Sequence, residues 1–79
     1  MRIDKYLKLT RIIKRRTIAQ EACDNQRVMI NEKVAKPSTE VKVGDIISIR
    51  FGNQTSKYEV LDIKEHLKKE ETNDLYRIL

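Results

Sequence analysis

Cysteine, proline, glycine and tryptophan are scarce or absent: the 79 residues include one cysteine, one proline, two glycines and no tryptophan. The single cysteine, Cys23, excludes an internal disulfide and a zinc site built from several cysteines, and it suits a reducing compartment. So few glycines and prolines argue against a linker or a low-complexity chain. No uninterrupted apolar run reaches half of the ~20 residues that a membrane span requires, and the N-terminus lacks the apolar stretch of a secretory signal. We therefore expect a soluble cytoplasmic protein that does not enter a membrane.

Groups that carry out catalysis are also missing from the sequence. The single histidine, His66, lies in a charged segment without a cysteine or a second histidine that could complete a metal site. There is no glycine-rich phosphate-binding loop, no paired-carboxylate signature and no Ser-His-Asp order. Cys23 falls among apolar residues and is interpreted as a small buried hydrophobe. We expect no enzymatic activity, no cofactor and no bound metal.

The opening residues have helical periodicity. Ile3, Tyr6 and Leu7 recur at i, i+3 and i+4, which places them on one side of a short helix. Asp4 precedes Lys8 by four residues, in the favourable order for a helical ion pair. A helix this short does not persist alone, so it must be held by packing.

A second helix of about two turns is predicted after a basic turn. Thr17 and Gln20 have the spacing of a capping box, in which the threonine hydroxyl and the glutamine side chain satisfy backbone amides at the helix start. One apolar stripe follows: Ile18, Ala19, Ala22 and Cys23. Asn25 is the residue best able to take the left-handed conformation that ends the helix.

From residue 27 the hydrophobic period changes to two, which predicts strands. The residues expected to point inward are Val28, Ile30, Ile47, Ile49, Phe51 and Tyr58, whereas Arg50 and Lys57 are expected to be ordinary outward positions. A hairpin returns over 58–63, residues 64–74 are predicted to be a loop or frayed helix, and 75–79 to be a short last strand. The fold class is α+β, with two to three short N-terminal helices on a small, mostly antiparallel sheet. Residues 1–64 form one domain, and the charged segment 65–79 closes it.

Positive charge is confined to one end of the chain. Residues 1–16 contain seven basic and one acidic residue, a sum of +6, and the remaining ten basic and eleven acidic residues sum to −1. Such segregation favours a face for a polyanion. The alternative for any basic run is a solvated surface, and Asp4 could pair with Lys8, orient Arg2 or Arg16, or contact RNA directly.

The order of motifs resembles the S-four RNA-binding domain, named after the fourth small-subunit ribosomal protein. The resemblance comes from the helix, the basic turn and the second helix, followed by Val28-Met29-Ile30-Asn31 and Val43-Gly44-Asp45. With Met1–Leu7, Ile12–Thr17 and Asn31–Ser38 added, the whole chain is most similar to the RqcP-like family of small stand-alone S-four proteins, related to heat-shock protein 15. Two departures are Gln26, where the pattern usually has glycine, and Asn31-Glu32, where it has Asn-Gly; Asn25 and Asn31 are expected to supply the left-handed turns.

The resemblance implies a function. RqcP-like proteins bind the stalled large ribosomal subunit at 23S rRNA and peptidyl-tRNA, and support the alanine tailing carried out with the partner RqcH. A ribosome-associated monomer is therefore expected. The candidate RNA-binding residues are Arg2, Lys5, Lys8, Arg11, Lys14, Arg15, Arg16 and Arg27, with Asp4 and Thr17 as candidate orienting residues. Arg27 could equally be a simple exposed residue.

Other functions remain open at this point. A heat-shock-protein-15-like factor would recycle stalled large subunits without tailing, and a general rRNA-binding or assembly protein would use the same basic end. An rRNA-modifying enzyme would need a catalytic domain of several times this length. A protein-interaction module would bind with weak salt dependence.

Overall fold

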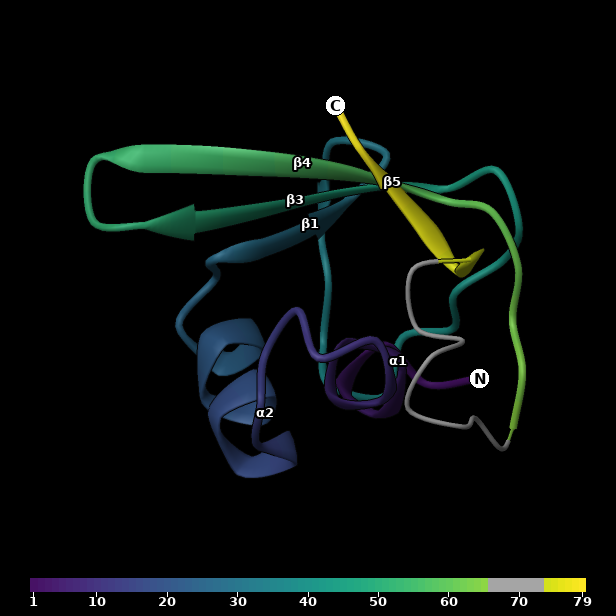
Figure 1. Cartoon of the computed structure of the whole chain (residues 1–79). Helices are drawn as coiled ribbons and strands as arrows, with labels where there is room; N and C mark the ends of the chain where they lie inside the picture. Colours follow the sequence, from purple (N-terminus) through teal and green to yellow (C-terminus); the bar gives the residue numbers. More distant parts are fainter. Residues whose placement is uncertain (66–73) are drawn as a thin grey trace.

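The computed structural model describes residues 1–65 and 74–79, and it places two short helices on one face of a five-stranded sheet (Figure 1). The elements in chain order are α1 (Ile3–Leu9), α2 (Arg16–Asp24), β1 (Val28–Ile30), β2 (Lys33–Val34), β3 (Ile46–Phe51), β4 (Gln54–Val60) and β5 (Tyr76–Ile78). All paired strands are antiparallel, in the order β2-β1-β3-β4-β5. The α+β prediction is confirmed, and so is the short last strand.

The core lies between α1 and the sheet, as the two periodicities predicted. Ile3, Tyr6 and Leu7 of α1 are fully buried. The inward residues of β1 and β3 lie opposite them: Val28, Ile30, Ile47 and Ile49. The Tyr6 hydroxyl donates a 2.7 Å hydrogen bond to the Leu75 carbonyl, which fastens α1 to the C-terminal segment. Burial raises the pKa of Tyr6, so its hydroxyl remains a donor at neutral pH.

Phe51 does not join this core, contrary to the prediction. The alternation that buries Ile47 and Ile49 points Phe51 toward the same side of β3, but its side chain is 50 % exposed. Figure 1 shows the reason, because the end of the β3–β4 hairpin extends past both helices. Tyr58 is half-buried, with its ring 5.6 Å from that of Tyr76 in an edge-to-face arrangement.

The predicted capping box at Thr17 is wrong. α2 already begins at Arg16, its N-cap is Arg15, and no side chain caps it. Gln20 does not reach back to the Thr17 amide because its side-chain amide donates to the buried Asp4 carboxylate 3.0 Å away. Of the expected apolar stripe, Ala19 and Cys23 are buried, whereas Ile18 is 47 % exposed.

Cys23 is a free, buried thiol, as the sequence indicated. Burial raises its pKa to about 11, so the thiol stays protonated and weakly nucleophilic at neutral pH. No helix in residues 1–65 and 74–79 is long and apolar enough to span a membrane. His66 and the charged stretch 66–73 lie outside the described residues.

The left-handed position at the end of α2 is Gln26 and not Asn25. Asn25 has φ −91°, whereas Gln26 has φ +60°. The amides of Gln26 and Arg27 donate to the carbonyls of Cys23 and Ala22, which closes the last turn of the helix. At the β1–β2 turn, Asn31 and Glu32 both have positive φ (51° and 69°), so Asn31 does take the expected conformation.

Replacing Gln26 with glycine should stabilise the domain. A left-handed φ at a residue with a Cβ costs roughly 1–2 kcal/mol, so we expect Gln26→Gly to raise the free energy of unfolding by about 1 kcal/mol. For a domain of this size that corresponds to about 4–8 °C in Tm by thermal denaturation. Asn25→Gly is the matched control and should give no gain, because Asn25 has an ordinary φ. An unchanged Tm for Gln26→Gly would contradict the strain argument.

Candidate nucleic-acid interface

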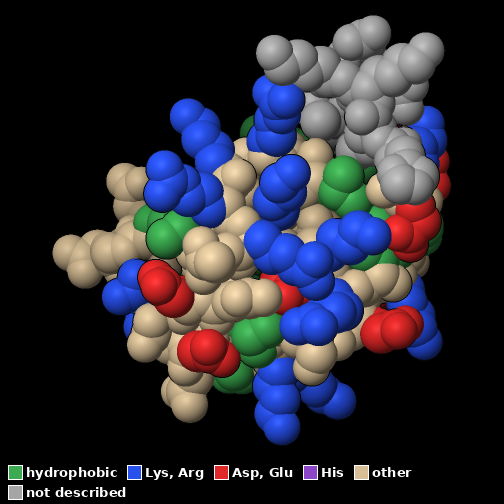
Figure 2. Space-filling view, turned by 90° about the horizontal axis from the view of Figure 1, so that it is seen from below, with side chains coloured by type: hydrophobic (Ala, Val, Ile, Leu, Met, Phe, Trp, Pro, Cys, Tyr) green, Lys and Arg blue, Asp and Glu red, His purple; other side chains and the backbone are tan. Residues whose placement is uncertain are grey.

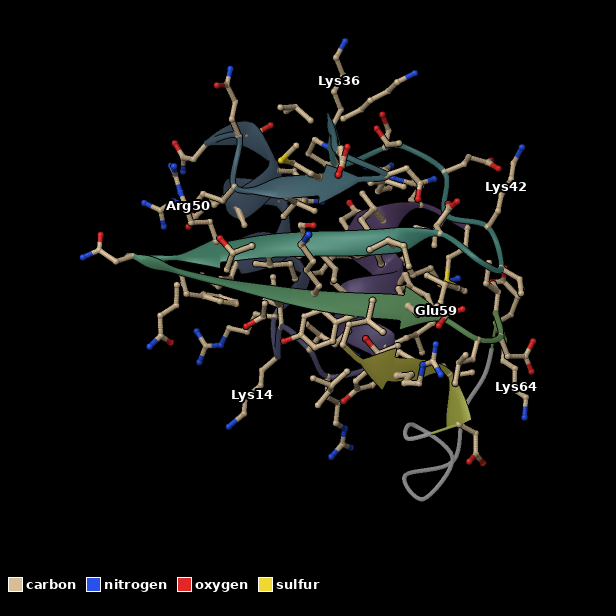
Figure 3. All side chains as sticks on the ribbon, turned by 90° about the horizontal axis from the view of Figure 1, so that it is seen from above. Lys14, Lys36, Lys42, Arg50, Glu59 and Lys64 are labelled. Atoms are coloured by element: carbon tan, nitrogen blue, oxygen red, sulfur yellow. The ribbon has the colours of Figure 1, made fainter. Side chains whose placement is uncertain are left out.

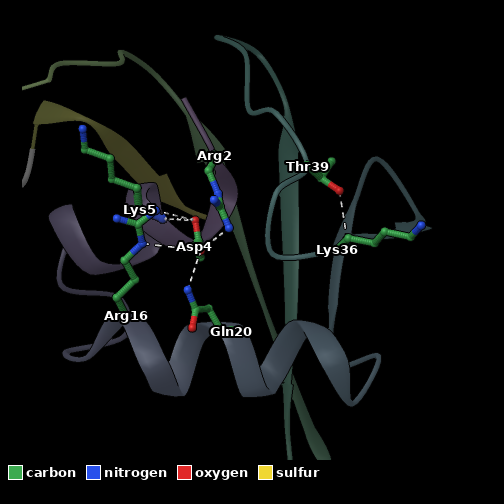
Figure 4. A network of polar contacts seen from close by, with 7 residues as sticks. All are labelled: Arg2, Asp4, Lys5, Arg16, Gln20, Lys36 and Thr39. Carbon is green, nitrogen blue, oxygen red and sulfur yellow. Dashed lines mark hydrogen bonds and ion pairs between the residues drawn. The ribbon is translucent and has the colours of Figure 1, made fainter.

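A buried carboxylate organises the basic end of the molecule. Asp4, in the first turn of α1, has no exposed surface. Its Oδ2 accepts from Arg2 Nη2 at 3.0 Å and from Gln20 Nε2 at 3.0 Å, and it lies 3.4 Å from Arg16 Nε. Its Oδ1 accepts from the Lys5 amide at 2.8 Å (Figure 4). Asp4 thus links α1, α2 and the residue that precedes α1.

These contacts keep Asp4 ionised in spite of its burial. Burial alone would raise the pKa of the carboxyl, because a charge is costly away from water. The hydrogen bonds from Gln20, Arg16 and the Lys5 amide, together with the positive charge of Arg16, outweigh it and hold the pKa below its ordinary value of 3.8. The carboxylate is therefore a fixed anion that accepts from both guanidinium groups.

Arg2 and Arg16 are consequently held in place while still reaching solvent. Their side chains are 48 % and 43 % exposed, respectively. A guanidinium has five N–H donors, so contact with Asp4 leaves donors on each arginine for an external acceptor. Of the alternatives for Asp4, the pair with Lys8 is wrong, and the contacts with Arg2 and Arg16 are the ones that form, with Gln20 added.

A second group of cations surrounds a hollow of about 290 Å³. Among the residues that the structure describes, Lys8, Arg11 and Lys14 line it, and all three are exposed at the surface. Arg11 has φ +61°, and the amides of Arg11 and Ile13 donate to carbonyls of the last turn of α1. This tight reversal returns Lys14 toward Lys8. Three like charges around one concave surface favour an anion.

The two groups belong to one surface, which we call the basic face. Its members are Arg2, Lys5, Lys8, Arg11, Lys14, Arg15 and Arg16. Lys5 and Lys8 are one turn apart on α1, and Lys14 to Arg16 lead directly into α2. Figure 2 shows lysine and arginine side chains gathered over the helical side of the molecule. Lys5 also pairs with Glu65, with Nζ 2.7 Å from Oε2, so part of its charge is balanced.

Arg27 lies away from the Lys8–Arg11–Lys14 hollow. It shares two smaller hollows with Arg50, between the end of α2 and the β3–β4 hairpin. Sequence reasoning missed Gln20 as the partner of Asp4. Its spacing from Thr17 matched a capping box, and no local pattern signals a contact across 16 residues.

The chain is similar to known proteins in both sequence and structure. Residues 1–47 match the S4 domain, the S-four domain of the sequence analysis. The RQC P-site tRNA stabilizing factor of Streptococcus pneumoniae is 49 % identical over 79 residues, covering all of this chain and 90 % of that protein. The protein of the same name from Bacillus subtilis is 47 % identical, covering all of this chain and 92 % of that one. In three dimensions the chain is similar to heat shock protein 15 of Vibrio cholerae, with a TM-score of 0.89 and 30 % identity over all of this chain and 81 % of that one.

The S4 family model covers more than half of this chain, and the two named relatives each align with all 79 of its residues. The match to the S4 domain spans α1, the basic turn, α2 and the start of β3. The chain therefore belongs to the RQC P-site tRNA stabilizing factor (RqcP) family of S4-domain proteins.

Proposed function

We propose that this protein is a non-enzymatic RNA-binding factor of ribosome-associated quality control. It binds the stalled large ribosomal subunit at 23S rRNA and the peptidyl-tRNA, and supports RqcH-dependent alanine tailing of the nascent chain. The observation that carries the proposal is the grouping of cations on the helical side, where Arg2 and Arg16 meet at Asp4 and where Lys8, Arg11 and Lys14 line one hollow. The relatives of this chain are named for stabilising P-site tRNA.

The basic face suits RNA that is read through its backbone. Structured RNA is recognised mostly by shape and by phosphate and 2′-hydroxyl contacts. Arg2 and Arg16, held by Asp4, can each grip phosphate oxygens with two parallel hydrogen bonds, and the lysines act as mobile point charges. Because no side chain caps α2, its first amides are available to a phosphate as well.

A second candidate is recycling of stalled large subunits without tailing, as in heat-shock-protein-15-like factors. The structural similarity to the Vibrio cholerae protein favours it. The two functions share the RNA surface and differ in the partner. Purification of the tagged protein together with RqcH supports the tailing role, and purification with large subunits lacking RqcH supports recycling.

Charge reversal on the basic face tests the RNA-binding proposal. We expect the double variant Lys14→Glu/Arg15→Glu to lose co-sedimentation with large subunits that carry peptidyl-tRNA, because both side chains are exposed and reversal repels phosphate. Tailing of a stalled reporter should fall with it. The matched control is Lys33→Glu/Lys57→Glu, which makes the same charge change at two exposed lysines outside the basic face. Lys57 lies opposite Ser48 on the sheet face turned away from the helices. Unchanged sedimentation of the double variant would refute the proposal.

A further inference from the structure

A hollow of about 180 Å³ lies between α2 and the overhanging β3–β4 hairpin. Its apolar lining is Ile13, Ile18, Ala22 and Phe51. Phe51 is 50 % and Ile18 is 47 % exposed, so a ring and a branched side chain face solvent across this small space. The hydrophobic core leaves both of them out, although Phe51 continues the inward register of β3.

The rim of this hollow is polar, with two cations, one anion and one amide. Arg27 and Arg50 line it together, and the Arg50 amide donates a 2.9 Å hydrogen bond to the carbonyl of Arg27, the residue before β1. Glu21 and Asn25 of the α2 end complete the rim. An apolar floor with an aromatic ring, two guanidinium groups and two hydrogen-bonding side chains matches the parts of a nucleotide.

We propose that this hollow binds one unpaired nucleotide of the RNA that contacts the basic face, with the base against Phe51 and the phosphate near Arg27 and Arg50. The inference rests on the proposed RNA-binding function and adds a second, single-stranded contact to it. Unpaired bases are commonly stacked on aromatic or arginine side chains and read along their exposed edges. The Glu21 carboxylate can accept hydrogen bonds from the edge of the base, and the Asn25 side-chain amide can both donate and accept them.

The size and position of the hollow favour this occupant. Pockets for drug-sized molecules are about 300–1,000 Å³, so this one suits a single small planar group. A docked protein helix would need a row of apolar anchors one turn apart, and here a single ring and a single isoleucine are exposed. Ile13 lines this hollow and the next residue, Lys14, lines the cationic one, so one turn of the chain connects the two hollows. Figure 3 shows Lys14 and Arg50 on opposite flanks of the hairpin.

The test compares a short RNA duplex with the same duplex carrying a single-stranded extension. The wild-type protein should bind the extended RNA more tightly than the duplex. Phe51→Ala should weaken binding of the extended RNA roughly tenfold and leave binding of the duplex unchanged. Phe51→Trp gives a second measurement, because the chain has no other tryptophan. Its fluorescence should be quenched by the extended RNA and not by the duplex.

Ile78→Ala is the matched control, since Ile78 is a 70 % exposed apolar residue on β5, and it should bind both RNAs like the wild type. If the wild-type protein binds the two RNAs with equal affinity, the nucleotide site is refuted, and the proposal that the basic face binds RNA is not affected. Binding to neither RNA would overturn both proposals. Loss of a protein partner from Phe51→Ala, with RNA binding intact, would identify a protein-docking surface instead and also overturn the site.

Discussion

Replacing Asp4 with alanine should lower both the stability of the domain and its affinity for RNA. The substitution removes an acceptor of charge-assisted hydrogen bonds and leaves the Gln20 amide and the Lys5 N–H without their partner. Because hydrogen bonds to charged groups contribute about 1.5–3 kcal/mol, we expect the free energy of unfolding to fall by about 2 kcal/mol. Thermal denaturation should show a Tm lower by about 10 °C.

The expected loss of RNA affinity distinguishes an effect of Asp4 on the orientation of the arginines from its effect on the net charge of the protein. Asp4→Ala raises the net charge of the protein by one, so general electrostatic attraction alone would strengthen RNA binding. If Asp4 instead holds Arg2 and Arg16 in the orientation that meets phosphate, the variant binds more weakly at a temperature where it is folded. Glu65→Gln is the matched control, because it also removes one negative charge beside the basic face without touching the Asp4 contacts. Tighter binding by both variants would contradict the positioning role.

The same carboxylate sets a pH dependence at acid pH. The pKa of Asp4 in the folded protein is below its ordinary value of 3.8, so the ionised form stabilises the fold. This contribution is fully present above about pH 4 and is lost as the pH falls through the lower, folded-state value. The stability difference between the wild type and Asp4→Asn should therefore be constant from pH 7 to about pH 4 and shrink below that. Urea titrations at stepped pH measure it, and a difference that disappears already near pH 6 would assign the effect to another group.

Local periodicity was enough to predict the elements and most of the core. The i, i+3, i+4 spacing of Ile3, Tyr6 and Leu7 and the alternation of Ile47 and Ile49 each reflect which side of an element is apolar, and all five are buried. Periodicity cannot say where the neighbouring layer ends. Phe51 has the correct phase on β3, yet it is half exposed because the hairpin extends past the helices (Figure 1).

The candidate site was predictable in composition and not in arrangement. The charge segregation of residues 1–16 is visible in the sequence. The Gln20 side chain could cap the start of α2 or donate to the buried Asp4 carboxylate. It donates to Asp4, because a buried carboxylate without hydrogen-bond donors costs far more free energy than an uncapped helix end. The return of Lys14 toward Lys8 depends on the left-handed backbone of Arg11, a conformation that arginine does not signal.

Neutralising the cationic hollow should produce the largest change in RNA affinity. Contact of about five cations with phosphates gives a slope of log K against log[salt] of roughly −3.5 to −4.5. The triple variant Lys8→Gln/Arg11→Gln/Lys14→Gln removes three of them, so the slope should fall to between about −1.4 and −1.8. At 0.15 M salt the lost counterion release weakens binding by roughly 100-fold, and near 1 M salt the two proteins should converge.

Net charge alone could mimic part of this loss, so the control must carry the same charge change elsewhere. Lys33→Gln/Lys42→Gln/Lys57→Gln removes three exposed lysines outside the basic face and brings the net charge to the same value. Its slope should stay close to that of the wild type, because counterion release counts the phosphates that are contacted and not the total charge of the protein. If the two triple variants change the slope equally, the cations around the hollow act only through the overall field of the molecule. Only a slope change confined to the first variant identifies Lys8, Arg11 and Lys14 as the groups that touch the RNA backbone.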